Sequence, residues 1–310
     1  MSFTYVLGKM LSLAVMMILG FIAKRRGILS AKTNRDLSEL VVDITTPCMM
    51  LASLSATEAS RSDLLLMLAA GIAFYALFIA AAELAAKKIR CSEKEKPVFK
   101  YFAVFTNNAF MGFPVVRALW GNKALVYTSL LNIPVSILMY SYGIFQYARG
   151  AGKGEKFEPK KLLNVPIISA VLVLILAMCS FKFTGPVQET LEIIGDATVP
   201  LSMIVIGSTL AESPVRGLIE DKRLYICAFI RLLIIPVIVF GLVFFMPFDP
   251  LIKGVLVVIS AMPGSANGVI FAQLYSFNRT LSSRYVFIST VLSVVTIPLM
   301  SVIILSPLGI

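Results

Sequence analysis

Long apolar runs alternate with short polar connectors along the whole chain of 310 residues. A helix of about 20 apolar residues is long enough to cross roughly 30 Å of hydrocarbon. We expect ten such helices, joined by connectors too short to form a separate soluble domain. Their predicted ranges are 3–23, 37–55, 64–86, 101–120, 124–147, 162–181, 190–210, 224–246, 251–275 and 285–306. The pattern therefore predicts an all-α polytopic membrane protein.

Two of the ten runs carry polar and helix-breaking residues in the middle of their apolar stretch. These residues are Asn107, Asn108, Gly112 and Pro114 in the fourth run, and Pro263, Gly264 and Asn267 in the ninth. Proline removes a backbone donor and collides with the preceding turn, and glycine weakens the helix further. Since freed peptide groups are tolerated only against protein or in a wet cavity, we expect both helices to be interrupted at mid-membrane. Alternatively, these residues only allow close helix packing, because glycine and proline are common in membrane helices.

One polar motif, Asp-x-Thr-x-Pro, occurs once in each half of the chain. Its residues are Asp43, Thr45 and Pro47 in the second run, and Asp196, Thr198 and Pro200 in the seventh. Because each half has five predicted crossings, the second half would lie upside down relative to the first, which is the inverted repeat of many secondary transporters. We therefore expect one five-helix repeat at 1–148 and a second at 162–310. A glycine-containing basic linker at 149–161 would join them.

The two acids of this motif have two interpretations. A carboxylate buried in a membrane can titrate near neutral pH, so Asp43 and Asp196 are candidates for coupling to a proton or another ion. Alternatively, each acid has a packing role near a helix end, where it can reach the lipid headgroups. Thr45 and Thr198 can bond to a carbonyl of their own helix.

Two arginines also fall inside predicted helices. Arg117 either draws an anionic substrate toward the outer vestibule or extends its side chain to the interface, and we favour the interface. Arg231 lies deeper and should need a partner. Glu83 is one candidate for that partner, and the sequence does not decide the pairing.

Composition and charge agree with a membrane protein and indicate its orientation. Hydrophobic residues make up 58% of the chain, charged residues 15%, and the mean hydropathy is +0.88. The net charge of +11 does not indicate nucleic-acid binding, because 21 of the 28 Lys and Arg residues lie in the connectors after the first, third, fifth, seventh and ninth runs. By the positive-inside rule these connectors are cytoplasmic, so both termini should face outward. The first run is expected to be a retained span, since its basic residues follow it.

The sequence offers no set of residues typical of an enzyme or a metal site. The chain has four cysteines, which form no close pair in the sequence, and no histidine. A Cys/His zinc site and histidine-based catalysis are therefore not expected. We also find no nucleophile motif and no phosphate-binding loop, and we expect no cofactor.

Three segments resemble the auxin efflux carrier family in its compact, prokaryotic form. Residues 107–114 with 118–121 are similar to the fourth-helix motif of that family. Residues 197–201, continuing to Gly207 and Leu210, resemble its seventh helix. Residues 261–264, followed by 271–272, resemble its ninth helix. The resemblance covers nearly the whole chain in the right order.

The resemblance implies that broken helices 4 and 9 cross at mid-membrane, as in the related bile-acid:sodium symporters. Helices 1, 2, 6 and 7 would form a scaffold, and helices 3–5 with 8–10 a transport unit. Members of the family move organic anions by alternating access, auxin in plants and malate or similar carboxylates in some bacterial members. By position, Asn107 matches a substrate-contacting asparagine and Asp196 a substrate-facing residue at the start of helix 7. Such a carrier lies in the inner membrane among lipids, and a homodimer is one assembly that it allows.

The leading hypothesis is a permease or efflux carrier for small organic anions. Its site would lie between two groups of residues: Asn107, Asn108, Pro114, Pro263 and Asn267 in the crossover, and Thr45, Pro47, Asp196 and Thr198 in the scaffold. One alternative is a sodium- or proton-coupled symporter that uses Asp43 or Asp196. Another is a membrane sensor that binds a ligand without moving it.

Overall fold

The computed structural model describes residues 3–88, 91–152, 164–212 and 221–305, and within these ranges the chain is helical apart from short connections. The α-helices before residue 153 are α1 (Phe3–Arg25), α2 (Ala31–Leu40), α3 (Thr46–Ala52), α4 (Arg61–Lys88), α5 (Lys96–Val104), α6 (Phe113–Trp120), α7 (Leu125–Leu138) and α8 (Ile144–Gly150). The later α-helices are α9 (Val165–Met178), α10 (Gly185–Asp196), α11 (Thr198–Glu212), α12 (Lys222–Phe229), α13 (Ile235–Phe244), α14 (Pro250–Ser260), α15 (Asn267–Leu274) and α16 (Arg279–Leu305). Most of the predicted linker at 149–161 lies outside the described residues.

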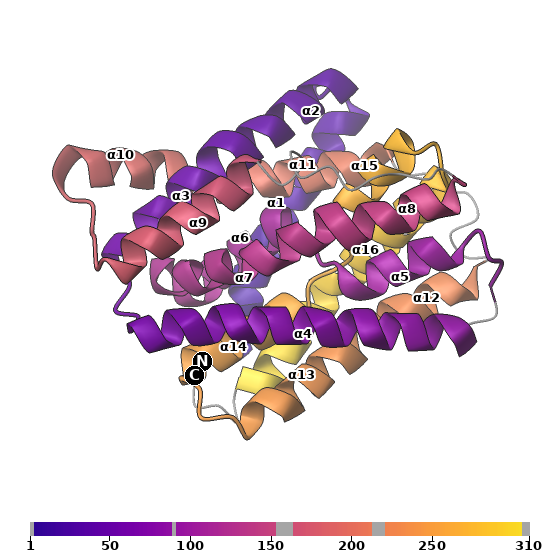
Figure 1. The fold of residues 1–310 in the computed structure, drawn as a ribbon. Helices are drawn as coiled ribbons and strands as arrows, with labels where there is room; N and C mark the ends of the chain where they lie inside the picture. Colours follow the sequence, from indigo (N-terminus) through magenta and orange to yellow (C-terminus); the bar gives the residue numbers. More distant parts are fainter. Residues whose placement is uncertain (1–2, 89–90, 153–163, 213–220, 306–310) are drawn as a thin grey trace.

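Seven helical stretches of the described residues are long and apolar enough to cross a membrane. They are Thr4–Arg25, Ala31–Ser55, Arg61–Lys87, Asn122–Gly150, Gly185–Glu212, Lys222–Phe244 and Arg279–Ile303. Two shorter apolar helices, α9 and α14, lie in the sixth and ninth predicted runs. The structure is therefore an all-helical, multi-pass bundle, in which α4 runs along one side and α10 lies at one edge (Figure 1).

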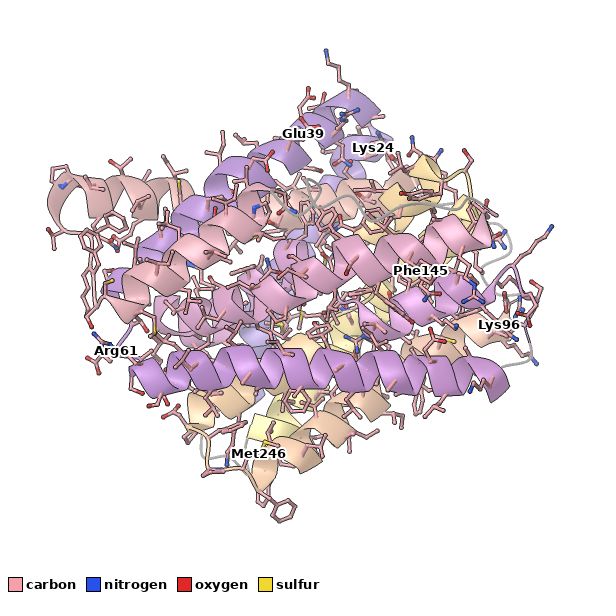
Figure 2. The ribbon with its side chains drawn as sticks, in the orientation of Figure 1. Lys24, Glu39, Arg61, Lys96, Phe145 and Met246 are labelled. Atoms are coloured by element: carbon pink, nitrogen blue, oxygen red, sulfur yellow. The ribbon has the colours of Figure 1, made fainter. Side chains whose placement is uncertain are left out.

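Charged and apolar side chains occupy different parts of this bundle. Figure 2 shows Arg61 at the start of α4 and Lys96 beyond its other end, whereas Phe145 lies on α8, within the outline of the bundle. Phe145 is 51% exposed, and exposed Leu, Ile, Val and Phe side chains recur along α1, α4, α9 and α13. Because most of these side chains lie on the flanks of helical stretches that are long enough to span a bilayer, the exposed apolar surface suits contact with lipid.

Three of the described π-helical turns end two residues before a proline. Val41–Thr45 precedes Pro47, Asn108–Gly112 precedes Pro114, and Ile230–Ile234 precedes Pro236. Proline has no N–H and clashes with the turn before it, and one extra residue in that turn relieves both problems. The helices therefore continue through these prolines with a local widening, which falls at polar positions that the sequence singled out: Asp43 and Thr45, Asn108, and Arg231.

Glycines allow α1 and α11 to pack with their backbones in contact. A Cβ atom on Gly207 would lie 1.8 Å from the carbonyl oxygen of Met17, and one on Gly20 would lie 2.2 Å from that of Ile204. Small residues at such crossings let helices approach closely, which is how membrane helices gain packing energy without a hydrophobic driving force between them. The two glycines make α1 and α11 one tightly packed unit.

We predict that Gly207→Ala destabilises the protein, because its methyl group would overlap a backbone carbonyl that belongs to a rigid helix. Overpacking of this kind costs about 1–3 kcal/mol. The apparent Tm of the purified protein in detergent should fall by several degrees. Gly8→Ala on α1 is the matched control, since its Cβ would meet nothing within 4 Å and alanine favours the helix by about 1 kcal/mol. Equal Tm values for the two variants would contradict this account of the α1–α11 contact.

Candidate functional site

The fourth and ninth predicted helices are both interrupted near their middle. Helix α5 ends at Val104, and the helical turns resume at Asn108 and continue into α6. Helix α14 ends at Ser260, and α15 begins at Asn267. Both breaks therefore lie at the polar, proline-containing segments that the sequence pattern predicted to be unwound.

The two breaks pair with each other through their backbones. The Asn107 N–H donates to the Pro263 carbonyl at 2.8 Å, and the Ser265 N–H donates to the Phe105 carbonyl at 3.1 Å. These two bonds flank an antiparallel bridge between Thr106 and Gly264. The bridge satisfies peptide groups that the helix breaks would otherwise leave unpaired inside the bundle, where each would cost free energy.

Glycine is required at position 264 because two aromatic rings lie against the bridge. A Cβ atom there would be 2.7 Å from the Tyr285 ring and 2.8 Å from the Phe102 ring. These two rings stack on each other with their centroids 4.5 Å apart. The Gly264 N–H donates to the Ser289 hydroxyl at 3.2 Å. The unwound segments are thus held in one position by side chains from their neighbours.

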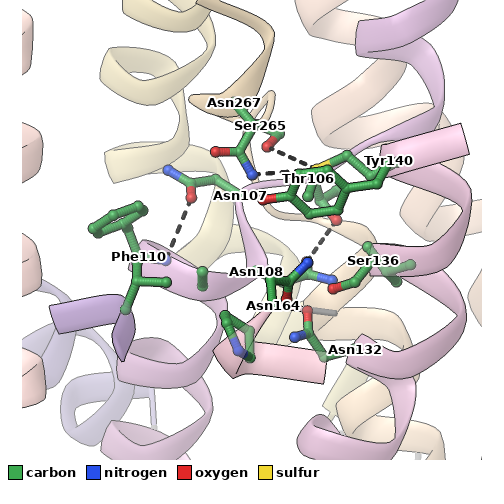
Figure 3. A pocket seen from close by; sticks show the side chains of 15 residues that line it. Thr106, Asn107, Asn108, Phe110, Asn132, Ser136, Tyr140, Asn164, Ser265 and Asn267 are labelled. Carbon is green, nitrogen blue, oxygen red and sulfur yellow. Dashed lines mark hydrogen bonds between the residues drawn. The ribbon is translucent and has the colours of Figure 1, made fainter. Parts of the chain in front are cut away.

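A cavity of about 70 Å³ lies beside the bridge. At 10–15 Å³ for one water, it holds roughly five waters or the polar end of a small ligand. Its lining consists of Val42, Thr106, Asn107, Asn108, Ala109, Phe110, Asn132, Val135, Ser136, Met139, Tyr140, Asn164, Pro166, Ser265 and Asn267. Figure 3 shows Asn108, Asn132 and Ser136 on one side of this space and Ser265 and Asn267 near Tyr140 on another. Nine of the fifteen lining residues have polar side chains, and none of the fifteen is charged.

Hydrogen bonds fix the two adjacent asparagines of the first break. The Thr106 hydroxyl donates to Asn108 Oδ1 at 2.6 Å, and the Tyr75 hydroxyl lies 3.2 Å from the same threonine oxygen. The Asn107 side chain accepts from the Phe110 N–H at 3.4 Å and so caps the second half of the broken helix. Both asparagines are therefore held at the cavity wall, where an amide can donate to a ligand oxygen or accept from a ligand proton.

The structure brings three of the predicted site residues together at this cavity and places the others elsewhere. Asn107, Asn108 and Asn267 line it. Pro263 lies within the bridge, where its carbonyl accepts a backbone bond. Pro114 lies in the first turn of α6, outside the lining.

The scaffold part of the predicted site does not line the cavity. Thr45 and Pro47 are buried in helix packing, and the Thr45 hydroxyl bonds to the Val41 carbonyl of its own helix at 3.4 Å. Thr198 is fully buried near the start of α11. Asp43 is exposed next to Val42, which does line the cavity. None of these four residues lines the cavity, so its geometry gives none of them a contact with a ligand.

Several cavity residues were not proposed as site residues from the sequence. They are Thr106, Asn132, Ser136, Tyr140, Asn164 and Ser265. The position of Asn132 in the apolar helix α7 was a usable signal. Asn164 gave a weaker signal, because it also caps α9 by accepting from the Ile167 N–H at 3.1 Å. Among the described residues, no group of three or more metal-ligating side chains is present.

Arg117 and Asp196 form an ion pair away from the cavity. Arg117 also donates to the Gly195 carbonyl at 3.3 Å and to the Asn122 side chain at 3.1 Å. The Arg117 side chain is 18% exposed and that of Asp196 is 63% exposed. This pair connects α6 with the end of α10, so the motif acid of the second half is engaged by an arginine rather than facing the cavity.

We predict that this ion pair contributes little to global stability, because one partner is largely solvent-exposed. A double-mutant cycle with Arg117→Gln and Asp196→Asn should give a coupling of about 1 kcal/mol or less in the free energy of unfolding. Arg117→Gln alone should cost more than Asp196→Asn alone, since it also removes the bonds to Gly195 and Asn122. Chemical denaturation in detergent measures the four proteins, and a larger loss for Asp196→Asn would contradict the geometry.

Comparison with known proteins places this architecture in a transporter family. Residues 5–301 match the model of the family described as "Membrane transport protein". An uncharacterised transporter of Methanothermobacter thermautotrophicus is 27% identical over 294 residues, which are 94% of this chain and 96% of that protein. One from Methanocaldococcus jannaschii is 25% identical, covering 92% of this chain and 94% of that protein. The uncharacterised transporter YfdV of Escherichia coli K12 is 23% identical, covering 96% of each chain. The chain therefore belongs to this family of membrane transport proteins, the auxin efflux carrier family.

Proposed function

We propose that the protein is a secondary carrier of small organic anions and that the cavity beside the bridge is its substrate site. The observation that carries this proposal is the position of two helix starts. The helical turns beginning at Asn108 and α15 beginning at Asn267 both have their first residues in the cavity lining. Helix N-termini carry partial positive charge and unpaired N–H groups, which favour an anionic ligand.

The proposed architecture is ten crossing helices in two inverted repeats of five, in the inner membrane with both termini outside. Contacts within each proposed unit support the division, and α7 with α9 and α1 with α16 pack across the boundary between the units. Helix α1 packs on α11, and α3 packs on both α9 and α10, which keeps the proposed scaffold helices together. In the proposed transport unit, α4 packs on α5 and α7, and α16 packs on α12, α14 and α15. Val42, Asn164 and Pro166 contribute to the cavity from the scaffold side, so the site lies at the boundary between the units.

In this proposal the ion pair between Arg117 and Asp196 is the contact that closes the outer side. Arg117 belongs to the transport unit and Asp196 to the scaffold, so relative movement of the two units must break their bond. The cavity is bounded by Asn164, which lies next to the linker that the charge pattern predicts to be cytoplasmic. Together these positions support an inward-facing conformation.

Flux measurements in proteoliposomes test the proposed function. The substrates are acetate, malate and indole-3-acetate, each compared with its uncharged amide. We expect the wild-type protein to move at least one acid faster than its amide, and Asn107→Ala and Asn108→Ala to reduce that flux by about tenfold or more, as expected for the loss of a ligand-binding hydrogen bond.

The matched control for these variants is Ser129→Ala in α7. Ser129 is buried, but its hydroxyl bonds to the Leu125 carbonyl and does not line the cavity. Its flux should stay near the wild-type value. Wild-type flux in Asn107→Ala with intact folding would remove Asn107 from the site, and equal rates for every acid and its amide would contradict an anion carrier.

Proton coupling is a second candidate mechanism, favoured by the position of Asp43. This carboxylate follows Val42 of the cavity lining and lies within electrostatic range of Tyr140, which also lines the cavity. A proton taken up by Asp43 would neutralise a negative charge next to the site when an anion binds.

A coupled carrier should move the acid faster under an inward proton gradient, and Asp43→Asn should abolish that acceleration. Uptake with imposed sodium, proton or no gradients separates the cases. Asp36→Asn is the control, because Asp36 is an exposed acid on α2 that does not line the cavity. Gradient-dependent flux that survives in Asp43→Asn would exclude Asp43 as the coupling group.

A further inference from the structure

Arg231 is a fully buried cation in the interior of the bundle. It lies in the π-helical turn Ile230–Ile234, near the middle of the membrane-length stretch Lys222–Phe244, and is 1% exposed. A guanidinium group keeps its proton under all conditions that a protein survives. The chain therefore carries a permanent positive charge at a depth where charged groups are rare and are usually functional.

Within the described part of the chain, none of the three guanidinium nitrogens of Arg231 has a hydrogen-bond partner. Glu83, the partner considered from the sequence, instead bonds to Lys100 at 2.6 Å and to the Tyr142 hydroxyl at 2.7 Å. Other cations with little exposure do have a carboxylate. The side chains of Lys24, Lys100 and Arg117 are 14–18% exposed, and each forms an ion pair. Arg231 is more buried than any of these, and it forms no ion pair within the described residues.

The immediate neighbours of Arg231 are aromatic. Its guanidinium carbon lies 5.7 Å from the centroid of the Phe78 ring, and the side chains of Tyr75 and Tyr285 are within electrostatic range. A ring face offers a cation partial compensation only, much weaker than a carboxylate would provide in the same place. The positive charge is therefore partly screened and not neutralised.

Both tyrosines connect Arg231 to the paired breaks. The Tyr75 hydroxyl lies 3.2 Å from the Thr106 hydroxyl, which in turn donates to Asn108 in the cavity wall. The Tyr285 ring lies against Gly264 on the other strand of the bridge. Arg231 is thus linked to both strands of the bridge, through Tyr75 on one and Tyr285 on the other, and it does not line the cavity.

We propose that Arg231 is the residue that sets the preference of this carrier for anions, because its charge is neutralised only when an anion occupies the cavity beside the bridge. This inference rests on the proposed function and names the side chain that gives the neutral cavity its charge selectivity. The cavity lining supplies hydrogen bonds without charge, and Arg231 supplies charge without hydrogen bonds. In a low-dielectric interior, an unpaired charge near a binding site changes anion affinity by about tenfold or more.

The test compares Arg231→Gln with Arg231→Lys in the flux assay of acids against their amides. Arg231→Gln should reduce the acid-to-amide preference by at least about tenfold, mainly through the KM of the acid, while leaving amide flux unchanged. Arg231→Lys retains the charge and should keep most of the preference. A Gln variant with wild-type preference would overturn the proposal.

A second measurement distinguishes this role from a purely structural one. Removal of a buried, uncompensated charge should leave the ligand-free protein as stable as the wild type or more stable, so the Tm of Arg231→Gln without ligand should not fall. The matched control is Arg223→Gln in the same membrane-length stretch. Arg223 is bonded to Glu95 at 2.9 and 3.0 Å and to Asp221, and these bonds hold the pKa of both carboxyls below their ordinary values.

Arg223→Gln should therefore lower the Tm and keep the acid-to-amide preference, which is the opposite pattern. A loss of ligand-free stability in Arg231→Gln with unchanged preference would assign Arg231 a structural role and overturn the proposal. If the wild-type protein prefers none of the three acids over its amide, the proposed function itself fails. The stability comparison still reports in that case whether Arg231 is an uncompensated charge.

Discussion

The pairing of two broken helices is the interaction on which the rest of this structure depends. A peptide group that leaves a helix inside a bilayer must find another partner, and here residues 105–107 and 263–265 provide it for each other. Gly264 is needed because the bridge lies against two rings, and Asn107 is needed to cap the helix that resumes beyond it. The same pairing aims two helix starts at one small cavity, so the backbone constraint and the candidate site have a common origin.

The sequence predicted those features of this arrangement that follow from the free-energy cost of particular residues within a helix. Proline and glycine beside asparagine in an apolar run are unfavourable in a continuous helix, and both breaks were located from that alone. The partner of each freed group could not be predicted, because pairing depends on which segments meet in space. Asn132 and Asn164 were missed for that reason: each is one polar residue whose neighbours across the cavity come from other helices.

The repeated Asp-x-Thr-x-Pro motif shows the limit of the same reasoning. An acid, a hydroxyl and a proline are unfavourable in an apolar helix, but the folded protein can offset that free-energy cost in several ways. Pro47 is accommodated by a π-helical turn, Thr45 bonds to its own helix, and Asp196 pairs with Arg117. A polar residue in an apolar run therefore indicates that something compensates for it, and only the folded arrangement distinguishes a ligand from a neighbouring side chain. Asp43 is the member of the motif whose neighbour in the chain, Val42, lines the cavity.

The same reasoning about compensation applies to the charged side chains inside the bundle. Several poorly exposed lysines and arginines of the described chain pair with a carboxylate at an end of the bundle or at a contact between helices. Lys100 with Glu83 and Arg117 with Asp196 are examples. Arg231 instead has the Phe78 ring beside it and two tyrosines within electrostatic range. A carboxylate beside Arg231 would neutralise it permanently and leave the cavity without preference for charge. An unpaired cation that does not line the cavity attracts an anion without forming a bond that would have to break at release.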